Sequence, residues 1–541
     1  MHQSTSEPHQ GEAEANILHE PEPSRGWLGW LVSGTVHASV LCLFAYWVWT
    51  RMAEPIDYPP VVISSKPPVM QPEEKPVVRE RMPVDTQTVP LDTTVEVDVA
   101  SPVTDLEIPQ DVPQTDDDSD AKQMNGDESL ADSAMGGQGV AAFIGVGGPP
   151  KGRMGRPGPG GRQRAGAPYG LTRKTITSTD SGLRWLKRHQ NPDGAWDAVT
   201  YAANCQENPR CEPGVNQSGD TSVALTGYAL LCFLGSGYDH RIGTYRATIR
   251  KGLDALIARQ GADGLLGKRN YEHAIAAQAL FEAYGMTEDP DLREPCEKAL
   301  AVILSRQAKD PKAADSAYAG LGWDYVTANP ARNDSSVTGW NVMALKAAHQ
   351  AGLAGAKAGL DGAKRWLDRA WAAANRSAMP KDAYGDSVFP YTWDAATDTA
   401  SETKPSNKSH DMTPVGMVCA VFLGHDSGDV MLETMANHVM KHQQPTSWAT
   451  YNSYYTYYNT MGMFQVGGDK WKAWNGKVRD IIIDAQRTEE GCFQGSWDWD
   501  GAVAWHGVET GRVLSTCYAI LNLEVYYRKE RVTGEQGRRA R

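Results

Sequence analysis

The chain has 541 residues, but its prolines, glycines and apolar residues are so unevenly distributed that we expect one large globular domain rather than several. Its formal net charge of -13 argues against nucleic acid as a partner, because binding to a polyanion depends on clustered Lys and Arg side chains that neutralise phosphates.

The first predicted element is a transmembrane helix over residues 27–49, which follows a cytoplasmic tail at residues 1–26. The segment from Trp27 to Trp49 has no charged side chain and, at about 1.5 Å per residue, is long enough to cross a hydrocarbon layer of about 30 Å. Aromatic side chains at both ends suit the membrane interfaces. A cleaved signal peptide fits less well, because the stretch is long and acidic residues precede it. We therefore expect a single-pass membrane protein.

Ser33 and His37 lie four residues apart and therefore on one face of that helix. The imidazole is either a neutral side chain that lipid tolerates or part of a functional contact. A Ser-x-x-x-His helix followed by prolines resembles the anchor of TonB-type energy transducers, although the C-terminal TonB domain is missing. The resemblance implies that Ser33 and His37 contact ExbB/ExbD-like motor proteins in the inner (cytoplasmic) membrane. It also implies a cytoplasmic N-terminus and a periplasmic C-terminal domain.

Residues 50–174 are predicted to form a disordered linker. Prolines recur in its first half, an acidic run covers residues 116–120, and a glycine-rich basic tract contains Arg153, Arg156, Arg162 and Arg164. Such a composition buries too little apolar surface to offset the entropy of the chain. The proline-rich part should be extended, so it can hold the following domain away from the bilayer. The basic tract either contacts anionic lipid or glycan, or is simply solvated.

A repeated pattern occupies residues 175–530, before a disordered basic tail at residues 531–541. In each copy an amphipathic helix ends at Gln or Asn, a turn with glycine follows, and a second helix is rich in small residues. The first helices end near Gln190, Gln260, Gln307, Asn375, Gln443 and Gln486, and the second begin near Asp220, Asn270, Asp334, Asp411, Asn452 and Thr510. Because the second helices carry almost no charge, we expect six helix pairs in two concentric rings, with the second helices inside.

The first copy contains Gly182, Trp185-Leu186, Gln190, Gly194 and Trp196, and it resembles the QW motif of the squalene-hopene cyclase and prenyltransferase repeat superfamily. The resemblance covers the repeats and implies an all-α fold, the α/α toroid. The tyrosine-rich stretch from Tyr454 and the ending around Tyr526 are similar to membrane-anchored bacterial members, notably those of planctomycetes, that have no assigned activity. The resemblance also implies that the motif is a structural clamp, formed here by Gln190, Trp196, Gln260, Gln486 and Trp497.

The sequence lacks the motifs of the superfamily's known activities. The Asp-x-Asp-Asp acid of the cyclases is missing, and Asp498-Trp499-Asp500 lies in a turn instead. Cys492, Asp498 or Asp500 and His506 are close in sequence, but they lack the spacing of the zinc ligands of protein prenyltransferases. The Cys-Gly-Glu-Gln thioester is also absent. We therefore expect no metal and no other cofactor.

The N-terminal ends of the inner helices should open on one face, where N–H groups and helix dipoles favour polar ligands. The predicted binding residues on this face are Asp220, Glu272, His273, Asp334, His410, Asp411, Tyr454, Tyr455 and Arg512. For an enzyme, the predicted acid/base residues are Asp498, Asp500, His506 and Glu509. Asp220, Asp334 and Asp411 are alternatively explained as helix N-caps. The tyrosines either line a pocket or fill the core.

The cysteines give one local prediction. Cys205 and Cys211 flank a short polar loop, a spacing that permits a disulfide and would suit an oxidising compartment. The sequence does not distinguish this disulfide from two free thiols. Cys232, Cys419 and Cys517 lie in apolar helical segments, where they are expected to be buried.

Three functional classes remain. The first is a membrane-anchored, extracytoplasmic binding module for an envelope lipid, glycan or protein, which its anchor would couple to a proton-driven motor. The second is an enzyme of the prenyltransferase, terpene cyclase or polysaccharide-degrading type that uses acidic residues in a central cavity, and the third is an envelope scaffold. An aromatic-lined cavity with a carboxylate of raised pKa would favour the enzyme. A filled centre would argue against it.

Overall fold

The computed structural model describes residues 37–40, 42, 161–216, 219–313, 319–376, 388–401, 411–499 and 504–528. The chain divides into two units, residues 1–110 and 111–541. Residues 37–40 and 42 of the first unit are helical, whereas Ser33 and most of the predicted membrane segment lie outside the described residues, as do residues 43–160 and the basic tail. Among the helices that are described, none has the length and apolar character needed to cross a membrane.

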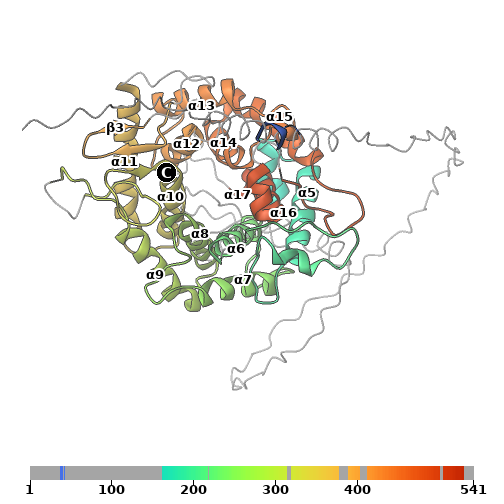
Figure 1. The fold of residues 1–541 in the computed structure, drawn as a ribbon. Helices are drawn as coiled ribbons and strands as arrows, with labels where there is room; N and C mark the ends of the chain where they lie inside the picture. The colour runs from blue at the N-terminus through green and yellow to red at the C-terminus, as the bar shows by residue number, and fades with distance from the viewer. Residues whose placement is uncertain are drawn as a thin grey trace, which may run out of the picture. The chain divides into compact units, whose positions relative to one another are not determined.

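Among the described residues of the second unit, six helices form an inner ring, whose arrangement can be followed in Figure 1. Each inner helix contacts the next one along the chain, and the last contacts the first, so the ring is closed. The inner helices are α6 (Gly219–Gly235), α8 (Asn270–Thr287), α10 (Ser335–Gln350), α12 (Thr413–Phe422), α14 (Ser453–Val466) and α16 (Ala504–Leu523). Their described side chains are mostly buried, which explains why these segments carry so little charge.

Six further helices form the outer ring: α5 (Arg173–Arg188), α7 (Arg246–Ala258), α9 (Pro290–Ser305), α11 (Ala356–Arg376), α13 (Val430–His442) and α15 (Gly468–Asp484). The outer helices α7 to α15 each pack on the inner helix that precedes them in the chain. Helix α5 has no preceding partner and packs on α16 instead. This arrangement confirms the predicted α/α toroid of six helix pairs.

The helix starts follow from local capping. Asp334 precedes α10 and accepts the backbone N–H of Val337, and Asn452 does the same for Tyr455 at the start of α14. The predicted starts of the inner helices lie within about two residues of the observed ones, a normal uncertainty for helix ends, with one exception. Helix α16 begins at Ala504 and bends at Gly511, whose φ of 62° lies in the left-handed region.

The domain begins earlier than predicted, so the end of the predicted linker at residue 174 is wrong. Helix α4 (Arg162–Gly166) and the 3-10 helix η2 (Ala167–Tyr169) precede α5. The Arg162 side chain is buried, forms an ion pair of 2.8 Å with Asp180 and lies over the ring of Tyr527. Tyr527 belongs to the last described helix, α17 (Val525–Arg528), which packs on α4. One arginine of the basic tract is therefore a core residue.

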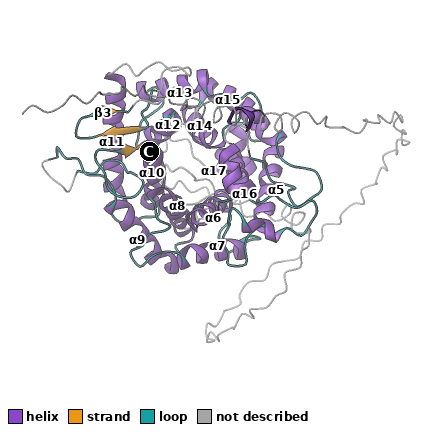
Figure 2. Cartoon of the chain, viewed as in Figure 1, coloured by secondary structure: helices purple, strands orange, loops and turns teal. Residues whose placement is uncertain are grey.

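The structure also contains a small sheet that the sequence analysis did not predict (Figure 2). Strands β1 (Asn333–Asp334), β2 (Thr392–Asp394) and β3 (Thr399–Ala400) pair antiparallel in the order β1-β2-β3, with Trp393 opposite both Asn333 and Ala400. Strand β1 leads directly into α10. The 3-10 helices η3 (Thr200–Asn204) and η6 (Trp448–Thr450) lie in the connections before α6 and α14.

Candidate functional site

Four glutamines at the ends of outer helices make the same two hydrogen bonds. The Gln190 amide donates to the carbonyl of Gly194 in its own turn (2.8 Å) and to that of Thr248 on the next outer helix, α7 (2.9 Å). Gln260 reaches Pro295 of α9, Gln307 reaches Gly359 of α11, and Gln486 reaches Ser178 of α5. The predicted clamp role of Gln190, Gln260 and Gln486 is confirmed, and Gln307, for which it was not predicted, has the same role. Asn375 and Gln443, at the two remaining helix ends, make other contacts.

The tryptophan of the motif is equally regular. The indole Nε1 of Trp196 donates to the carbonyl of Leu186 (2.8 Å), and its backbone N–H donates to the Thr226 hydroxyl (3.0 Å). Trp323 and Trp497 repeat both contacts with their own outer helix and an inner-helix threonine. In the α7–α8 copy Leu266 occupies the tryptophan position, and its N–H donates to Nδ1 of His273 (3.0 Å).

His273 is therefore a core residue rather than part of an open binding face. Its ring is fully buried, and Nε2 contacts the carbonyl of Ala299 on α9 at 3.1 Å. Burial lowers the pKa of His273 to about 4, so the imidazole is neutral. Glu272 is likewise structural, because its Oε1 accepts the backbone N–H of Arg269 (3.0 Å) as the second half of a capping box.

Asp334 and Asp411 lie at inner-helix starts, as predicted: Asp334 is the N-cap of α10, and Asp411 lies two residues before the first residue of α12. Asp334 accepts the Ser336 hydroxyl (2.6 Å) and the Val337 N–H, and its second oxygen pairs with Arg332 (3.0 Å). Burial raises the pKa of Asp334 despite these donors. Asp411 accepts the N–H of Thr413, and its other oxygen receives both His438 and Gln443 at 2.6 Å. Burial acts to raise the pKa of Asp411, but the bonds from His438 and Thr413 outweigh it and lower that pKa.

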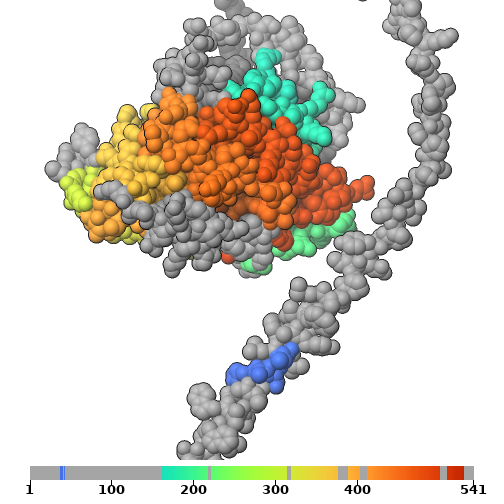
Figure 3. Space-filling model, turned by 90° about the horizontal axis from the view of Figure 1, so that it is seen from above, coloured from blue at the N-terminus to red at the C-terminus, as the bar shows by residue number. Residues whose placement is uncertain are grey.

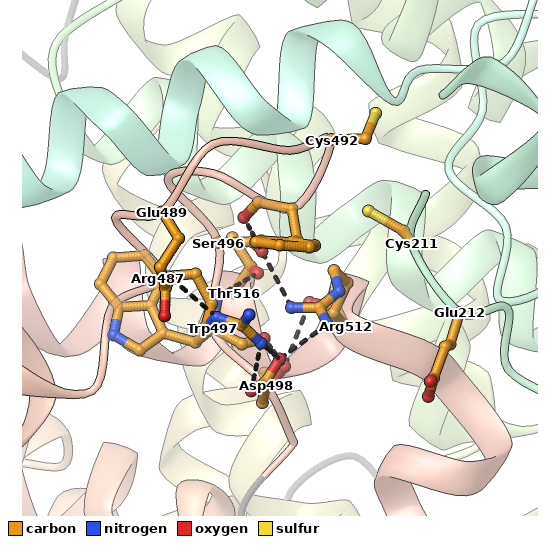
Figure 4. Close-up of polar contacts among 12 residues, drawn as sticks. Cys211, Glu212, Arg487, Glu489, Cys492, Ser496, Trp497, Asp498, Arg512 and Thr516 are labelled. Atoms are coloured by element: carbon orange, nitrogen blue, oxygen red, sulfur yellow. Dashed lines mark hydrogen bonds and ion pairs between the residues drawn. The ribbon is translucent and has the colours of Figure 1, made fainter. Parts of the chain in front are cut away.

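The predicted catalytic residues that the structure describes form no acid/base pair. Asp498 lies between two arginines, 3.0 Å from Arg487 Nη1 and 2.6 Å from Arg512 Nη2, and Arg512 also donates to the Ser496 hydroxyl (Figure 4). Arg512 is thus a buried partner of Asp498. The Glu509 side chain is exposed, while its carbonyl accepts the N–H of Asn216. The side chains of Asp220 and His506, and all of His410 and Asp500, lie outside the described residues.

Aromatic side chains fill the middle of the inner ring. Tyr228 of α6 contacts Tyr518 of α16, Tyr518 contacts Tyr457 of α14, Tyr457 contacts Trp340 of α10, and Trp340 returns to Tyr228; their ring centroids are 5.1, 5.6, 6.0 and 5.2 Å apart. Two of these contacts join helices that are not neighbours in the ring. Of the two alternatives left open by the sequence, a central cavity and a filled centre, the structure has the filled centre at this level, because the four rings meet across it.

Three tyrosines from the first two turns of α14 lie next to these central rings. The rings of Tyr454 and Tyr458 are 5.0 Å apart, those of Tyr454 and Tyr455 are 5.2 Å apart, and Tyr458 also contacts Trp340. Their hydroxyls are buried, and none makes a hydrogen bond of ordinary geometry among the described residues, although the Tyr454 hydroxyl interacts with those of Tyr458 and Tyr271. Burial raises the pKa of all three, so they are neutral donors and acceptors. We call Tyr454, Tyr455 and Tyr458 the tyrosine face.

A buried charge cluster lies further along the inner helices. The Arg528 guanidinium of α17 contacts Glu282 of α8 (3.1 Å), Glu524 (3.3 Å) and the carbonyl of Leu231 on α6 (2.6 Å). Glu524 also accepts the Ser236 hydroxyl (2.8 Å). Because three elements contribute to it, the cluster ties the C-terminal helix to the inner ring.

A second cluster gathers four potential metal ligands: His189, Cys205, Cys211 and Cys492, whose ligand atoms all lie within 4.8 Å of one another. The His189 Nε2 atom is 3.4 Å from the Cys205 sulfur, 3.6 Å from that of Cys211 and 3.3 Å from that of Cys492. All four side chains are buried. The predicted disulfide is not formed, because Cys205 and Cys211 are free thiols that both face the imidazole.

We considered Cys492 as a ligand together with Asp498 or Asp500 and His506 and expected no metal, whereas in the structure Cys492 lies beside His189, Cys205 and Cys211. His189 is 303 residues from Cys492, so only closure of the ring brings them together. The signal available in sequence was the pair of loop cysteines 16 and 22 residues after a histidine. That spacing is not specific enough to identify a site by itself.

No protein-family model matches the sequence, and no curated protein matches it. Three solved structures resemble the fold over 65% of this chain and 98% of each of theirs: an inactive variant of the α-1,6-mannanase GH76A of Salegentibacter sp. HEL1_6 with α-1,6-mannotetrose (TM-score 0.44, 11% identity), a novel α-amylase from Clostridium perfringens (0.43, 10%) and the type II terpene cyclase MstE from Scytonema (0.38, 12%). At this similarity we draw no conclusion about activity. The toroid is established by the helix arrangement itself.

Proposed function

We propose that the toroid is a binding module whose receptor surface is the tyrosine face, and that its ligand is a glycan of the cell envelope. The observation that carries the proposal is the set of three buried hydroxyls, on Tyr454, Tyr455 and Tyr458, that make no hydrogen bond of ordinary geometry among the described residues. A buried hydroxyl that lacks a partner costs about 1–3 kcal/mol, and buried polar groups in folded proteins nearly always have one. A bound ligand would supply the missing partners.

The chemistry of this face favours a sugar over an isoprenoid chain. A sugar offers hydroxyls to the tyrosines and apolar ring faces to the neighbouring aromatic rings. A hydrocarbon chain would fill the same space but leave the hydroxyls unpaired. The nearby carboxylates already have partners. Asp334 is bonded to the start of α10 and to Arg332. Asp411 is bonded to the start of α12 and to His438. A neutral, hydroxyl-rich ligand fits these surroundings.

An enzyme that acts on a polysaccharide is the second candidate. Asp334 supports it, because burial raises the pKa of this carboxyl and so favours the protonated form that a general acid needs. However, one Asp334 oxygen accepts Ser336 and Val337 and the other pairs with Arg332, so neither is free to face a substrate in this structure. Binding without catalysis therefore accounts for more of the contacts.

Calorimetric titration of the protein with maltoheptaose, mannohexaose and chitohexaose tests the proposal. We expect one of these probes to bind, and Tyr454→Phe and Tyr458→Phe to weaken its binding about 5- to 30-fold, the effect of losing about 1–2 kcal/mol from one hydrogen bond each. The matched control is Tyr527→Phe, which removes another buried hydroxyl without a partner among the described residues, but on α17. It should leave the affinity unchanged.

Two results would contradict the glycan proposal. Equal affinities for the wild type and both α14 variants would remove the tyrosine face as the receptor. Saturable binding of farnesol, with no binding of any of the three sugars, would point to a lipid ligand instead. Release of shortened sugars during the titration, abolished by Asp334→Asn, would favour the enzyme.

We also propose that residues 27–49 anchor the toroid in the inner membrane with the domain in the periplasm. The support is the uncharged, aromatic-flanked composition of this segment. An anchored receptor for envelope glycans would have its ligand within reach of the linker.

A further inference from the structure

We propose that His189, Cys205, Cys211 and Cys492 bind one zinc ion, which fastens the first helix pair of the toroid to the last. His189 follows α5, Cys205 and Cys211 lie in the loop after η3, and Cys492 lies in the turn after α15. The first and last segments of the domain thus meet at one point (Figure 3). The inference does not depend on the tyrosine face.

The distances fit a tetrahedral ion. Zinc binds thiolate sulfur at about 2.3 Å and imidazole nitrogen at about 2.0–2.1 Å, which places N and S ligands about 3.6 Å apart in a tetrahedron. The three observed distances from His189 Nε2 to sulfur are 3.3, 3.4 and 3.6 Å. Three sulfurs and one nitrogen also form a soft donor set, which binds zinc in preference to magnesium or calcium.

The surroundings hold the ligands in orientations suited to binding. His189 Nδ1 lies 2.8 Å from the carbonyl of Trp185, so Nδ1 carries the proton and the lone pair of Nε2 faces the sulfurs. The Trp185 ring stacks on the imidazole at 4.2 Å. Its Nε1 donates to the carbonyl of Cys492 (3.0 Å), and the N–H of Cys492 donates to the carbonyl of Pro209 in the cysteine loop (3.0 Å).

The other buried cysteines of the domain show what a structural thiol looks like in this protein. Cys232, Cys296, Cys419 and Cys517 lie within helices, and the Cys232 thiol donates to the Cys517 carbonyl at 3.5 Å. Among the described residues, none of these four joins a group of three or more possible metal ligands. Only the three loop cysteines converge on an imidazole nitrogen, which sets them apart from cysteines that fill space.

Four protein ligands and full burial indicate a structural rather than a catalytic zinc, because a catalytic ion keeps a position open for water or substrate. Three thiolates and one zinc ion carry a net charge of about -1. Arg512 acts electrostatically on both His189 and Cys211 and would offset this charge. Metal binding would therefore contribute directly to ring closure.

Metal analysis of the purified full-length chain, prepared under reducing conditions with zinc present, tests the proposal. We expect about one zinc ion per chain in the wild type and almost none in Cys492→Ser or His189→Ala. The matched control is Cys419→Ala, which removes a buried cysteine within α12 and should keep the zinc. His189→Cys should also keep it, because a fourth thiolate can replace the imidazole.

Cobalt substitution covers the case in which a variant fails to fold. The wild type should take up one Co²⁺ and show the thiolate-to-metal absorption of a tetrahedral site, which zinc then removes. A folded wild-type protein that binds neither metal would overturn the proposal. So would a Cys205–Cys211 disulfide found by mass spectrometry in protein that was never exposed to oxidant.

Discussion

At the scale of single residues, His273 shows how a repeat is held together where Leu266 stands at the position that tryptophan has in other copies. In three copies a tryptophan bonds to its own outer helix and to a threonine, whereas in the α7–α8 copy the imidazole joins the N–H of Leu266 to the carbonyl of Ala299. Both contacts need a neutral ring, because Nδ1 accepts and Nε2 donates. His273 is therefore a stability element that acid should disable.

The pH dependence of unfolding tests this role. The folded-state pKa of His273 is about 4, below the value of about 6.5 for an unfolded chain, so the unfolded state takes up the proton first. The stabilising effect of the neutral His273 ring is complete above pH 6.5 and is lost as the pH falls towards 4. Denaturant unfolding should show wild type losing about 3 kcal/mol more than His273→Gln over this range. Parallel curves for the two proteins would refute the assignment.

The structural role of a residue could be predicted from the sequence when its contacts lie within a few residues of it. Gln190 and Gln260 bond within their own turns, four residues away, so the motif alone identified them as clamps. Glu272 and Asp334 were named as binding residues, but their backbone partners lie within three residues: Asp334 caps α10, and Glu272, in the first turn of α8, completes a capping box. Sequence cannot show which polar side chains at a helix start remain free.

At the scale of helices, the repeated glutamine clamp ties an outer helix to the next one at four of the six junctions. Gln486 stands out because the next outer helix is α5, at the start of the domain. Gly495 follows the same rule: its φ is 91°, and a Cβ there would lie 2.6 Å from the carbonyl of Ser181 on α5. Gly194 meets Lys251 of α7 in the same way. The junction between the last and first outer helices is thus built like the three other clamped junctions.

Removing the Gln486 clamp, which joins the last outer helix to the first, should lower the free energy of unfolding as much as removing any other clamp. Gln486→Ala loses two hydrogen bonds, to Ser178 and Gly495, and we expect it to lower the free energy of unfolding by about 2 kcal/mol. Gln494→Ala is the matched control, because its amide contacts only Thr488 in the same exposed turn. That variant should change stability by less than about 0.5 kcal/mol. If urea unfolding gave the same free energy of unfolding for Gln486→Ala and Gln494→Ala, the Gln486 clamp would not stabilise the junction between α15 and α5.

The helices themselves were predictable because apolar spacing and capping residues are local signals. The segments that were missed depend on distant partners. Helix α4 follows a glycine-rich basic tract, and its place in the domain comes from Arg162 contacting Asp180 and Tyr527. The small sheet forms because Trp393 pairs with Asn333, 60 residues away. Neither contact leaves a periodic pattern in the sequence.

At the scale of the whole molecule, closure of the ring brings together the residues of the two proposed sites, the zinc site and the tyrosine face. The zinc ligands come from the two ends of the toroid, and the tyrosine face lies beside rings contributed by four inner helices. The sequence predicted the ring from its repeats, but it did not predict which side chains would meet across it. The filled centre and the His189 cluster are both consequences of closure.

The anchor provides a test on the intact protein in membranes. If the segment around Ser33 and His37 contacts a proton-driven motor, Ser33→Ala and His37→Ala should reduce the ExbB/ExbD-like proteins recovered with the chain from detergent-solubilised membranes. Ser39→Ala is the control, because a residue two positions from His37 lies on the opposite side of a helix. Unchanged recovery for all three variants would leave the anchor as a simple tether. Recovery of the wild type in the soluble fraction would contradict the membrane prediction itself.

A site-specific photo-crosslink tests closure of the ring most directly. Arg188 at the end of α5 is exposed, and its guanidinium donates to the carbonyl of Gln494, 306 residues later, at 3.1 Å. With p-benzoylphenylalanine at position 188, irradiation should join this position to the peptide containing Gln494 within the same chain. The same group at position 298, on α9, should not reach that peptide. A crosslink from position 188 that forms only between chains, or only to neighbouring repeats, would show that the helices form an open array instead.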